Sequence, residues 1–367
     1  MKNMNAYKLL TPGPLTTTSS VKEEMLMDRC TWDSEYKNMT QKIRAQLLQL
    51  AKVDPKDYTA VLMQGSGTFA VEAVMNTTIS GSDKALIITN GAYGERIVTI
   101  AQYIGLAFKE YSVAYDEHPK EEEIRNLLKE DQDITHIVMV HCETTTGILN
   151  PIEMVSDLSK EFGKTLIIDG MSSFGGMEIN VSELGIDYLI SSANKCIQGV
   201  PGFGFVIART EKLIACEGIS RSLSFDLYDQ WKVMNEDGKW RYTSPTHVVA
   251  AFSKALDELE EEGGIPSRYS RYKNNNRILR ERLSKLGFQT YITDEKQSPI
   301  ITTFLFPNET FSFEDFYAYV KERGFVLYPG KLTDVNTFRI GNIGEIYEED
   351  ITTLCNVIEE YLGVMTK

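Results

Sequence analysis

A loop of small residues follows one apolar segment of the chain and precedes a helical pattern. It reads Gln64-Gly-Ser-Gly-Thr68, with Ala70 two places further on. Glycines let a backbone approach a ligand closely, and a helix N-terminus offers unpaired N–H groups, so such a loop is suited to hold a phosphate. Ser66 and Thr68 add hydroxyl groups on either side of Gly67. The loop predicts a phosphate site, and a glycine-rich turn without a ligand stays open on these residues alone.

Two nucleotide-binding motifs offer competing interpretations. The loop at 65–70 matches G-x-G-x-x-A, but a dinucleotide site also needs an acidic residue at the end of the next strand. This chain has Thr89-Asn-Gly91 there. Gly163-Lys-Thr165 matches the end of a P-loop, but Leu158 stands where glycine is required, and a strand pattern follows. An NAD site is therefore a weaker alternative, and a nucleoside triphosphate site is not supported.

Two charged residues stand at the ends of apolar runs. Asp169 ends the run 165–169, and a carboxylate at the C-terminal end of a buried parallel strand points into the crevice where α/β sheets bind ligands. Lys195 follows the run 188–190 and has no acidic residue within five positions. Desolvation without a carboxylate partner lowers the pKa of a lysine and makes it a nucleophile. A turn aspartate and a solvated surface lysine are the ordinary alternatives.

The phosphate loop, Asp169 and Lys195, in that order, are the components of a pyridoxal 5′-phosphate (PLP) site. In such a site the loop holds the cofactor phosphate, the carboxylate keeps the pyridine nitrogen protonated, and the lysine forms a Schiff base. Tyr93 is available to cover the ring, and a threonine of 144–146 is available to reach its O3′ oxygen. His141 is interpreted as a core or supporting residue and not as a catalytic base.

Arg339 lies in a short apolar segment near the C-terminus, 337–340. A guanidinium group on such a strand is costly to bury without an anion, and its planar fork suits an acid group of a substrate. A structural ion pair with one of the 52 acidic residues is the alternative interpretation.

The elements that must position these residues follow a regular alternation from about residue 20 to 255. Short, continuous apolar runs fit strands that are buried on both faces, and their alternation with helical patterns predicts an α/β layered domain. The expected strands are 60–63, 85–89, 136–141, 165–169, 188–190 and an added strand at 202–208. The expected helices are 69–78, 95–105, 119–130 and 152–162.

The pattern changes after Gly263-Gly264, which with Pro266 marks a joint. At the other end of the chain, Leu10-Thr-Pro-Gly-Pro14 cannot be helical and predicts an extended arm. The sequence therefore predicts an N-terminal arm (1–20), a large cofactor-binding domain (21–264) and a small C-terminal α+β domain (265–367). In the small domain the expected helices are 266–286, 313–323 and 348–362, and the expected strands are 289–292, 299–306, 325–328 and 337–340.

Composition limits the partners. The 52 acidic and 38 basic residues give a net charge of −14, which argues against nucleic acid and anionic membranes. No run approaches the roughly 20 apolar residues needed to span a bilayer, and the N-terminus is too polar for a signal peptide. Five dispersed cysteines indicate reduced thiols and hence a cytoplasmic protein. The four histidines form no metal-binding motif, so no metal is expected.

The order of the motifs resembles the class V aminotransferases, which are fold-type I PLP-dependent enzymes. The resemblance covers essentially the whole chain and implies a large domain with a mainly parallel central sheet flanked by helices, plus a smaller α+β domain. It rests on Leu-Thr-Pro-Gly-Pro (10–14), Gln-Gly-Ser-Gly-Thr (64–68), Asn-Gly-Ala-Tyr-Gly (90–94), Glu-Thr-Thr-Thr-Gly (143–147), Ile-Asp-Gly-Met-Ser-Ser (168–173), Ser-Ala-Asn-Lys (192–195) and Phe-Arg-Ile-Gly (338–341).

Carried over residue by residue, the resemblance implies a role for each residue that matches the family motifs. These are Lys195 as the catalytic residue that bears the cofactor, Ser66, Gly67 and Thr68 at its phosphate, Tyr93 and Met171 at the two ring faces, Thr145 at O3′, Asp169 at the ring nitrogen, Asn194 beside the cofactor, Thr243 at the phosphate of a neighbouring subunit, and Arg339 at the anionic group of the substrate.

Longer blocks, such as 191–203 and 240–247, resemble family members that use an aminophosphonate. They imply transfer of the amino group of 2-aminoethylphosphonate to pyruvate, a step of phosphonate catabolism, through alternating PLP and pyridoxamine forms. The implied assembly is a homodimer with shared active sites. An aminotransferase that uses alanine or serine with glyoxylate or pyruvate stays open. Outside this class, a binding or NAD-dependent protein that uses the 65–70 loop also stays open.

Overall fold

Seven strands form a mainly parallel sheet at the centre of the computed structural model, which describes residues 7–330, 332 and 334–365. Strand β10 runs antiparallel to both its neighbours, and all other adjacent pairs are parallel. This confirms the predicted α/β class with a mainly parallel central sheet. In spatial order the strands are β2 (Tyr58–Gln64), β10 (Phe203–Arg209), β9 (Tyr188–Ser192), β8 (Thr165–Asp169), β5 (Ile134–Val140), β3 (Lys84–Thr89) and β4 (Ala107–Ser112).

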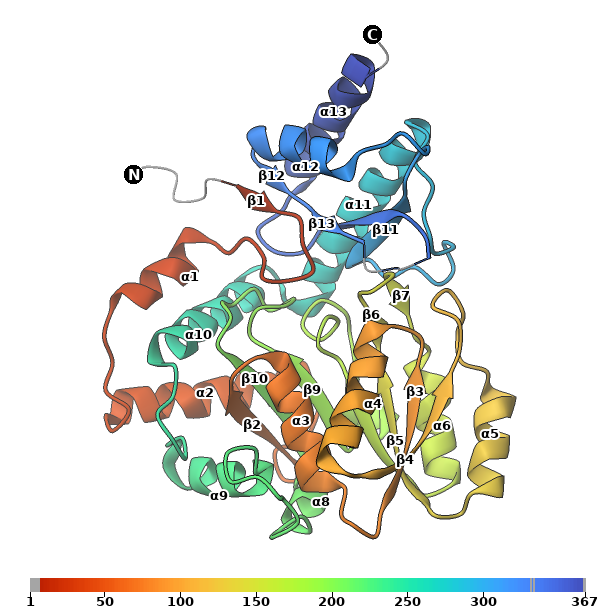
Figure 1. Ribbon diagram of the computed structural model, residues 1–367. Coiled ribbons are helices and arrows are strands. Elements are labelled where there is room, and N and C mark those ends of the chain that lie inside the picture. Colours follow the sequence, from red (N-terminus) through yellow and green to blue (C-terminus); the bar gives the residue numbers. More distant parts are fainter. Residues whose placement is uncertain (1–6, 331, 333, 366–367) are drawn as a thin grey trace.

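The strands of this sheet are buried on both faces. In β3, Leu86 and Ile88 belong to one apolar cluster, whereas Ala85 and Ile87 belong to another on the opposite face. Because both faces are covered by helices, the strands are continuously apolar, as the sequence pattern indicated. One cluster includes α3 (Gly67–Thr78) and α4 (Ala92–Ile104); the other includes α2 (Ser34–Leu50), α5 (Glu121–Glu130), α6 (Ile152–Glu161) and α10 (Thr246–Glu261) (Figure 1).

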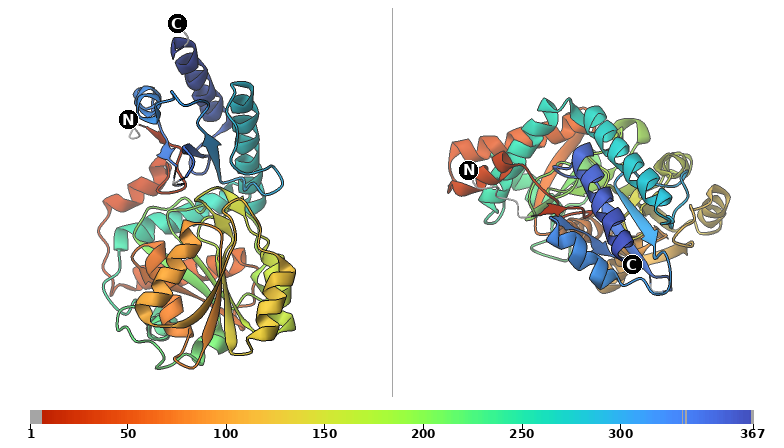
Figure 2. Two further views of the ribbon diagram at one scale, coloured as in Figure 1. Left: turned by 45° about the vertical axis from the view of Figure 1, so that its right-hand side comes forward. Right: turned by 90° about the horizontal axis from the view of Figure 1, so that it is seen from above.

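A second, antiparallel sheet follows in the C-terminal part of the chain, with strand order β11-β14-β13. Its core is aromatic, and the rings of Phe304 and Phe338 stack with centroids 5.6 Å apart. Figures 1 and 2 show this part beyond one end of the large sheet. Its elements are β11 (Ile301–Leu305), β13 (Tyr328–Pro329), β14 (Thr337–Gly341), α11 (Gly264–Lys285), α12 (Phe313–Glu322) and α13 (Glu348–Met365). The domain boundaries given above stay a prediction.

Backbone hydrogen bonds join the N-terminal arm to the C-terminal part of the chain. Strand β1 (Lys8–Leu9) pairs in parallel with β12 (Phe325–Val326), and Gly341 N donates to Leu10 O at 3.0 Å. The first six residues of the predicted arm lie outside the described residues. The shorter elements of the chain are α1 (Ser19–Glu23), a 3₁₀ turn (Glu24–Leu26), β6 (Cys142–Glu143), β7 (Ile148–Leu149), α7 (Val181–Leu184), α8 (Thr210–Ile214) and α9 (Leu227–Asp237).

Two strand predictions in the C-terminal part are corrected by the structure. The strand expected at 289–292 is wrong, because Thr290 forms only an isolated bridge with Phe304 and its hydroxyl donates to Ile292 O in a turn. The strand expected at 325–328 is divided into β12 and β13, because the first pairs with the arm and the second with β14. The pairing partner of the first half lies more than 300 residues away, so local pattern carries no sign of it.

Among the described residues, no helix combines the length and apolar character that crossing a membrane requires. The same part of the chain holds no group of three or more His, Cys, Asp or Glu side chains arranged to bind a metal ion.

Candidate active site

A cavity of about 410 Å³ opens beside the C-terminal ends of β2, β8 and β9. Parallel α/β sheets bind their ligands at this edge. Eight of the residues singled out from the sequence line it, and they come from four separate segments of the chain. They are Ser66, Gly67, Thr68, Tyr93, Asp169, Met171, Asn194 and Lys195.

The phosphate loop joins β2 to α3 in a conformation that only small residues allow. Gly65 has a φ of 116°, and a Cβ on it would lie 2.0 Å from the ring of Phe69. A Cβ on Gly67 would lie 2.3 Å from the sulfur of Met171. Ser66 precedes the helix and makes no side-chain capping bond to it. The hydroxyl and the first N–H groups of α3 therefore face a cavity suited to a phosphate.

Asp169 is the last residue of β8 and is almost completely buried. Its Oδ1 accepts a hydrogen bond of 2.8 Å from Met171 N. Burial raises the pKa of the carboxyl group to about 6, against smaller opposing effects that include the charge of Lys195. A buried carboxylate of this kind calls for a cationic hydrogen-bond donor, which a protonated pyridine nitrogen provides.

Lys195 follows β9 and extends into the cavity. Desolvation lowers the pKa of its amine, and the amine donates a hydrogen bond of 2.9 Å to Pro12 O of the arm. Gly13 passes so close that a Cβ on it would lie 2.9 Å from Lys195 Cδ. This contact between the arm and the lysine was not predicted from the sequence. The donor set of loop, buried carboxylate and desolvated lysine fits PLP.

Tyr93 projects from the first turn of α4 at the rim of the cavity. The guanidinium carbon of Arg96 lies 4.9 Å from its ring centroid, and Arg96 Nη1 donates to Thr68 Oγ1 at 3.3 Å. Arg96 thus adds a cation beside the phosphate loop. The sequence motif Asn90-Gly-Ala-Tyr-Gly94 contains Tyr93 but stops two residues before Arg96, so the motif alone did not identify it.

Glu143 is a second residue that the sequence reasoning missed. Its carboxylate is fully buried and accepts N–H groups of Tyr93 at 3.2 Å and Gly94 at 3.1 Å through Oε2. Its Oε1 accepts the N–H group of Thr145 at 3.2 Å and its hydroxyl at 2.6 Å. Desolvation raises the pKa of Glu143, although these four donors oppose it. The available signal is an acidic residue directly before three threonines, 144–146.

Three predicted site residues do not line this cavity. The hydroxyl of Thr145 is engaged by Glu143 and by Ala92 N at 3.0 Å. Thr243 lies on an exposed segment before α10. Arg339 is 3% exposed in the middle of β14, and it reaches toward the large sheet.

Arg339 is buried against carbonyl oxygens. Its Nη1 donates to Thr144 O at 2.9 Å and its Nε to Pro329 O at 3.0 Å. Burial lowers the pKa of Arg339. The charge of Tyr93 and its hydrogen bond with Arg339 act in the opposite direction and raise this pKa. Within the part of the chain that the structure describes, Arg339 makes no ion pair with an acidic side chain. The guanidinium therefore stays available for an external anion beside Tyr93.

Comparison with known proteins identifies the class. A family model described as aminotransferase class V matches residues 29–337. The chain belongs to the class V aminotransferases, and it is a PLP-dependent enzyme. This confirms the predicted family, enzyme class and cofactor, and it excludes the NAD-dependent alternative.

Individual relatives are similar over almost the whole chain. The 2-aminoethylphosphonate–pyruvate transaminase of Lysinibacillus sphaericus (strain C3-41) is 64% identical, over 98% of this chain and 99% of that protein. The protein of the same name from Bacillus cereus (strain G9842) is 56% identical, over 97% and 98%. Among solved structures, ureidoglycine–glyoxylate aminotransferase from Bacillus subtilis has a TM-score of 0.90 at 20% identity, over 100% of this chain and 95% of that chain. That structure shows the fold alone.

Proposed function

We propose that this protein transfers the amino group of 2-aminoethylphosphonate to pyruvate, giving phosphonoacetaldehyde and L-alanine. The observation that carries this proposal is the 64% identity over 98% of the chain to a transaminase named for these two substrates. An alanine– or serine–glyoxylate or –pyruvate aminotransferase of the same class is the alternative. The buried guanidinium of Arg339 suits the anionic groups of either substrate set, so substrate identity rests on the relatives.

The cofactor would be held by three groups of residues at the sheet edge. Ser66, Gly67 and Thr68 would bind its phosphate through hydroxyl and N–H groups at the start of α3. Asp169 would hold the proton on its ring nitrogen, and Lys195 would bear it covalently. When bound, PLP supplies an electron sink for the negative charge that develops at the amino-bearing carbon of the donor.

Lys195 would move the proton during the reaction. Because desolvation lowers the pKa of its amine, a neutral Nζ is accessible nearer to physiological pH than in a solvated lysine. Nζ would take the proton from the amino-bearing carbon of the donor as a base and would then give it up as an acid toward C4′ of the cofactor, not to the same carbon. Its hydrogen bond to Pro12 O holds the amine against the N-terminal arm.

Arg339 would bind the acid group of each substrate in turn. The planar fork of a guanidinium pairs with two oxygens of a carboxylate or of a phosphonate, so one residue can serve both. Its existing bonds to Thr144 O and Pro329 O orient the fork. Arg339 also donates a hydrogen bond to Tyr93, so the proposed anion site would adjoin the residue that would cover one face of the cofactor ring.

The remaining roles follow the family pattern. Met171 would face the other side of the ring, and Asn194 would line the cofactor's surroundings. Thr145 would reach O3′. Thr243, which is exposed in the single chain, would contact the phosphate in a second subunit, and the proposed assembly is therefore a homodimer with shared sites. All five cysteines are unpaired, which favours a cytoplasmic location.

A panel of amino donors tests the substrate assignment. The purified protein with PLP is incubated with pyruvate and one donor, and L-alanine formation is measured. We expect L-alanine to form faster with 2-aminoethylphosphonate than with L-serine or taurine. Taurine is the matched control because it keeps the carbon chain and replaces the phosphonate by a sulfonate. A parallel reaction of L-alanine with glyoxylate measures the alternative. Faster turnover with serine, or in the glyoxylate reaction, would refute the assignment.

A further inference from the structure

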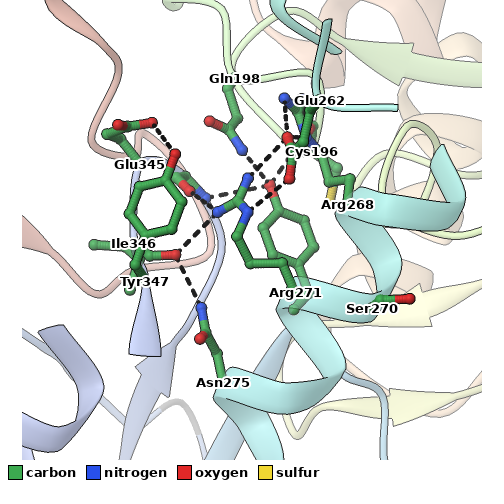
Figure 3. Close-up of polar contacts among 12 residues, drawn as sticks. Cys196, Gln198, Glu262, Arg268, Ser270, Arg271, Asn275, Glu345, Ile346 and Tyr347 are labelled. Atoms are coloured by element: carbon green, nitrogen blue, oxygen red, sulfur yellow. Dashed lines mark hydrogen bonds and ion pairs between the residues drawn. The ribbon is translucent and has the colours of Figure 1, made fainter. Parts of the chain in front are cut away.

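Arg268 of helix α11 holds the backbone that directly follows Lys195 (Figure 3). It is 2% exposed, and its Nη1 donates to the carbonyl oxygens of Cys196 at 3.0 Å and Ile197 at 3.2 Å. A charged donor strengthens such bonds in a buried setting. The position of Lys195 in the cavity therefore depends on a helix that belongs to the C-terminal part of the chain.

Tyr272, one turn further along α11, completes the contact. Its side chain is fully buried, and its hydroxyl donates to Cys196 O at 3.4 Å. The hydroxyl oxygen of Tyr272 in turn accepts hydrogen bonds from Gln198 Nε2 at 2.7 Å and from Gly344 N at 3.3 Å. One hydroxyl thus joins the turn after Lys195 to the turn after β14.

The turn after Lys195 needs such support because it is strained. Gln198 has a φ of 70°, a conformation that is costly for a residue other than glycine. Gln198 N donates to Lys195 O at 2.7 Å, which closes the turn on the lysine itself. A Cβ on Gly199 would lie 2.7 Å from Ala193 O, so the backbone is tightly folded on both sides of the strained residue. Surrounding contacts must therefore hold the turn in this form.

Arg271 makes the corresponding contact with the turn that follows Arg339. Its Nη1 donates to Gly344 O at 2.8 Å and to Ile346 O at 2.9 Å. Strand β14, which contains Arg339, ends only three residues before Gly344. Arg268, Arg271 and Tyr272 therefore connect the two segments that present the proposed catalytic lysine and the proposed anion-binding arginine.

The two arginines share one carboxylate. Glu262 Oε2 accepts from Arg268 Nε at 2.8 Å, and Glu262 Oε1 accepts from Arg271 Nε at 2.7 Å. Burial alone raises the pKa of Glu262, but the two guanidinium groups outweigh it and hold the pKa below its usual value. Each arginine thus has its Nε fixed by Glu262 and directs its outer nitrogen to a backbone carbonyl. An ion pair with a purely structural role would not require the bonds to the backbone of these two turns.

We propose that Arg268 and Tyr272 are positioning residues for Lys195, and that with Arg271 they couple the Lys195 turn to the turn after Arg339. The inference rests on the proposed function, in which Lys195 bears the cofactor. Neither residue lines the cavity, so both act through the backbone of 196–198.

Tyr272→Phe tests the positioning role, because it removes one oxygen and preserves the ring. In the PLP-loaded enzyme we expect kcat to fall about tenfold with the KM values of both substrates nearly unchanged. We also expect the pH midpoint of the cofactor's visible absorbance, which reports protonation at its link to Lys195, to move by about one unit without substrate. Arg268→Lys should shift both readouts in the same direction and further, because one ammonium group cannot replace the guanidinium fork.

Tyr269→Phe is the matched control. Tyr269 lies on the same helix, and its hydroxyl makes none of these contacts. The Nζ atom of Lys273 lies 5.8 Å from its ring centroid. If Tyr272→Phe behaves like Tyr269→Phe, the inference is overturned. If Tyr272→Phe lowers the melting temperature and kcat but leaves the pH midpoint of the cofactor's absorbance unchanged, its role is merely structural and the inference is also overturned. If the wild-type enzyme carries PLP on a residue other than Lys195, the proposed function itself fails.

A double-mutant cycle tests the coupling between the two turns. Tyr272→Phe is combined with Arg339→Lys, and kcat/KM is measured for all four proteins. We expect the combined loss to differ from the product of the single losses by at least about threefold, as found for residues that share a network. Independent effects would contradict the link from α11 to the strand of Arg339. The positioning of Lys195 is decided separately, by the comparison of Tyr272→Phe with Tyr269→Phe.

Discussion

Lys195, in the turn after β9, and Arg339, in β14, are two desolvated basic groups whose surroundings are alike. Each donates to backbone carbonyls, Lys195 to Pro12 O and Arg339 to Thr144 O and Pro329 O. Desolvation lowers the pKa of both groups. The outcome differs because a lysine amine gives up its proton readily when buried, whereas a guanidinium group stays charged. One environment can therefore supply both a proton-transfer group and a permanent anion site, depending on the side chain.

Lys195→Ala should have the largest effect. Removal of the amine eliminates both covalent attachment of the cofactor and proton transfer, so we expect kcat to fall by at least about 10³-fold. The measurements are alanine formation and peptide mapping after borohydride reduction, which should no longer find labelled Lys195. Lys129→Ala, on the exposed surface of α5, is the control and should retain full activity. Normal turnover of the Lys195 variant would contradict the assignment.

Arg339→Ala should leave the cofactor attached and weaken both substrates. Loss of a charged, two-pronged donor is expected to lower kcat/KM by about 100-fold for 2-aminoethylphosphonate and for pyruvate alike. Single-turnover measurement of each half-reaction separates the two substrates. Arg339→Lys should lie between wild type and alanine. An effect confined to pyruvate would show that the phosphonate is bound elsewhere.

Glu143→Gln tests whether the buried acid that accepts the N–H groups of Tyr93 and Gly94 orders the cofactor site. An amide keeps the volume but turns an NH₂ group toward N–H donors that the carboxylate accepts, either those of Tyr93 and Gly94 or that of Thr145. We expect the dissociation constant of PLP, measured by titration of the apoprotein, to rise about tenfold. Glu122→Gln, on the exposed face of α5, should leave it unchanged. An unaltered constant for the Glu143 variant would exclude a role for its charge.

Asp169→Asn is expected to give the smallest of these effects, an increase in the free energy of unfolding of the apoprotein. The pKa of Asp169 is about 6 in the folded protein and 3.8 in its ordinary state. The folded state therefore binds more protons between these two values, so its stability falls as the pH rises from 3.8 to about 6 and stays lowered above that. At pH 7.5 the variant should unfold at higher urea, by on the order of 2 kcal/mol, and the gain should vanish near pH 4. Equal stability of wild type and variant at pH 7.5 would show that the ionised carboxylate of Asp169 does not destabilise the folded protein, and would contradict this prediction.

Local sequence identified the parts of the site that lie at strand ends. The phosphate loop, Asp169 and Lys195 each follow a continuous apolar run, and the regular alternation of strands and helices brings such ends to one edge of a sheet. Glu143 and Arg96 were missed because their importance lies in contacts with Tyr93 and Thr68, which come from other segments. A pattern of spacing along the chain contains no information about such contacts.

The sequence by itself determined the α/β class, the order of the cofactor-binding motifs and the residue types that PLP chemistry needs, because periodicity and turn residues are local properties. Only the tertiary structure decided that the arm meets Lys195 through Pro12, that β12 and β13 separate, and that α11 joins Lys195 to the strand of Arg339. These features depend on packing between segments far apart in the chain. Burial, which lowers the pKa of Lys195 and raises that of Asp169, arises from the same packing.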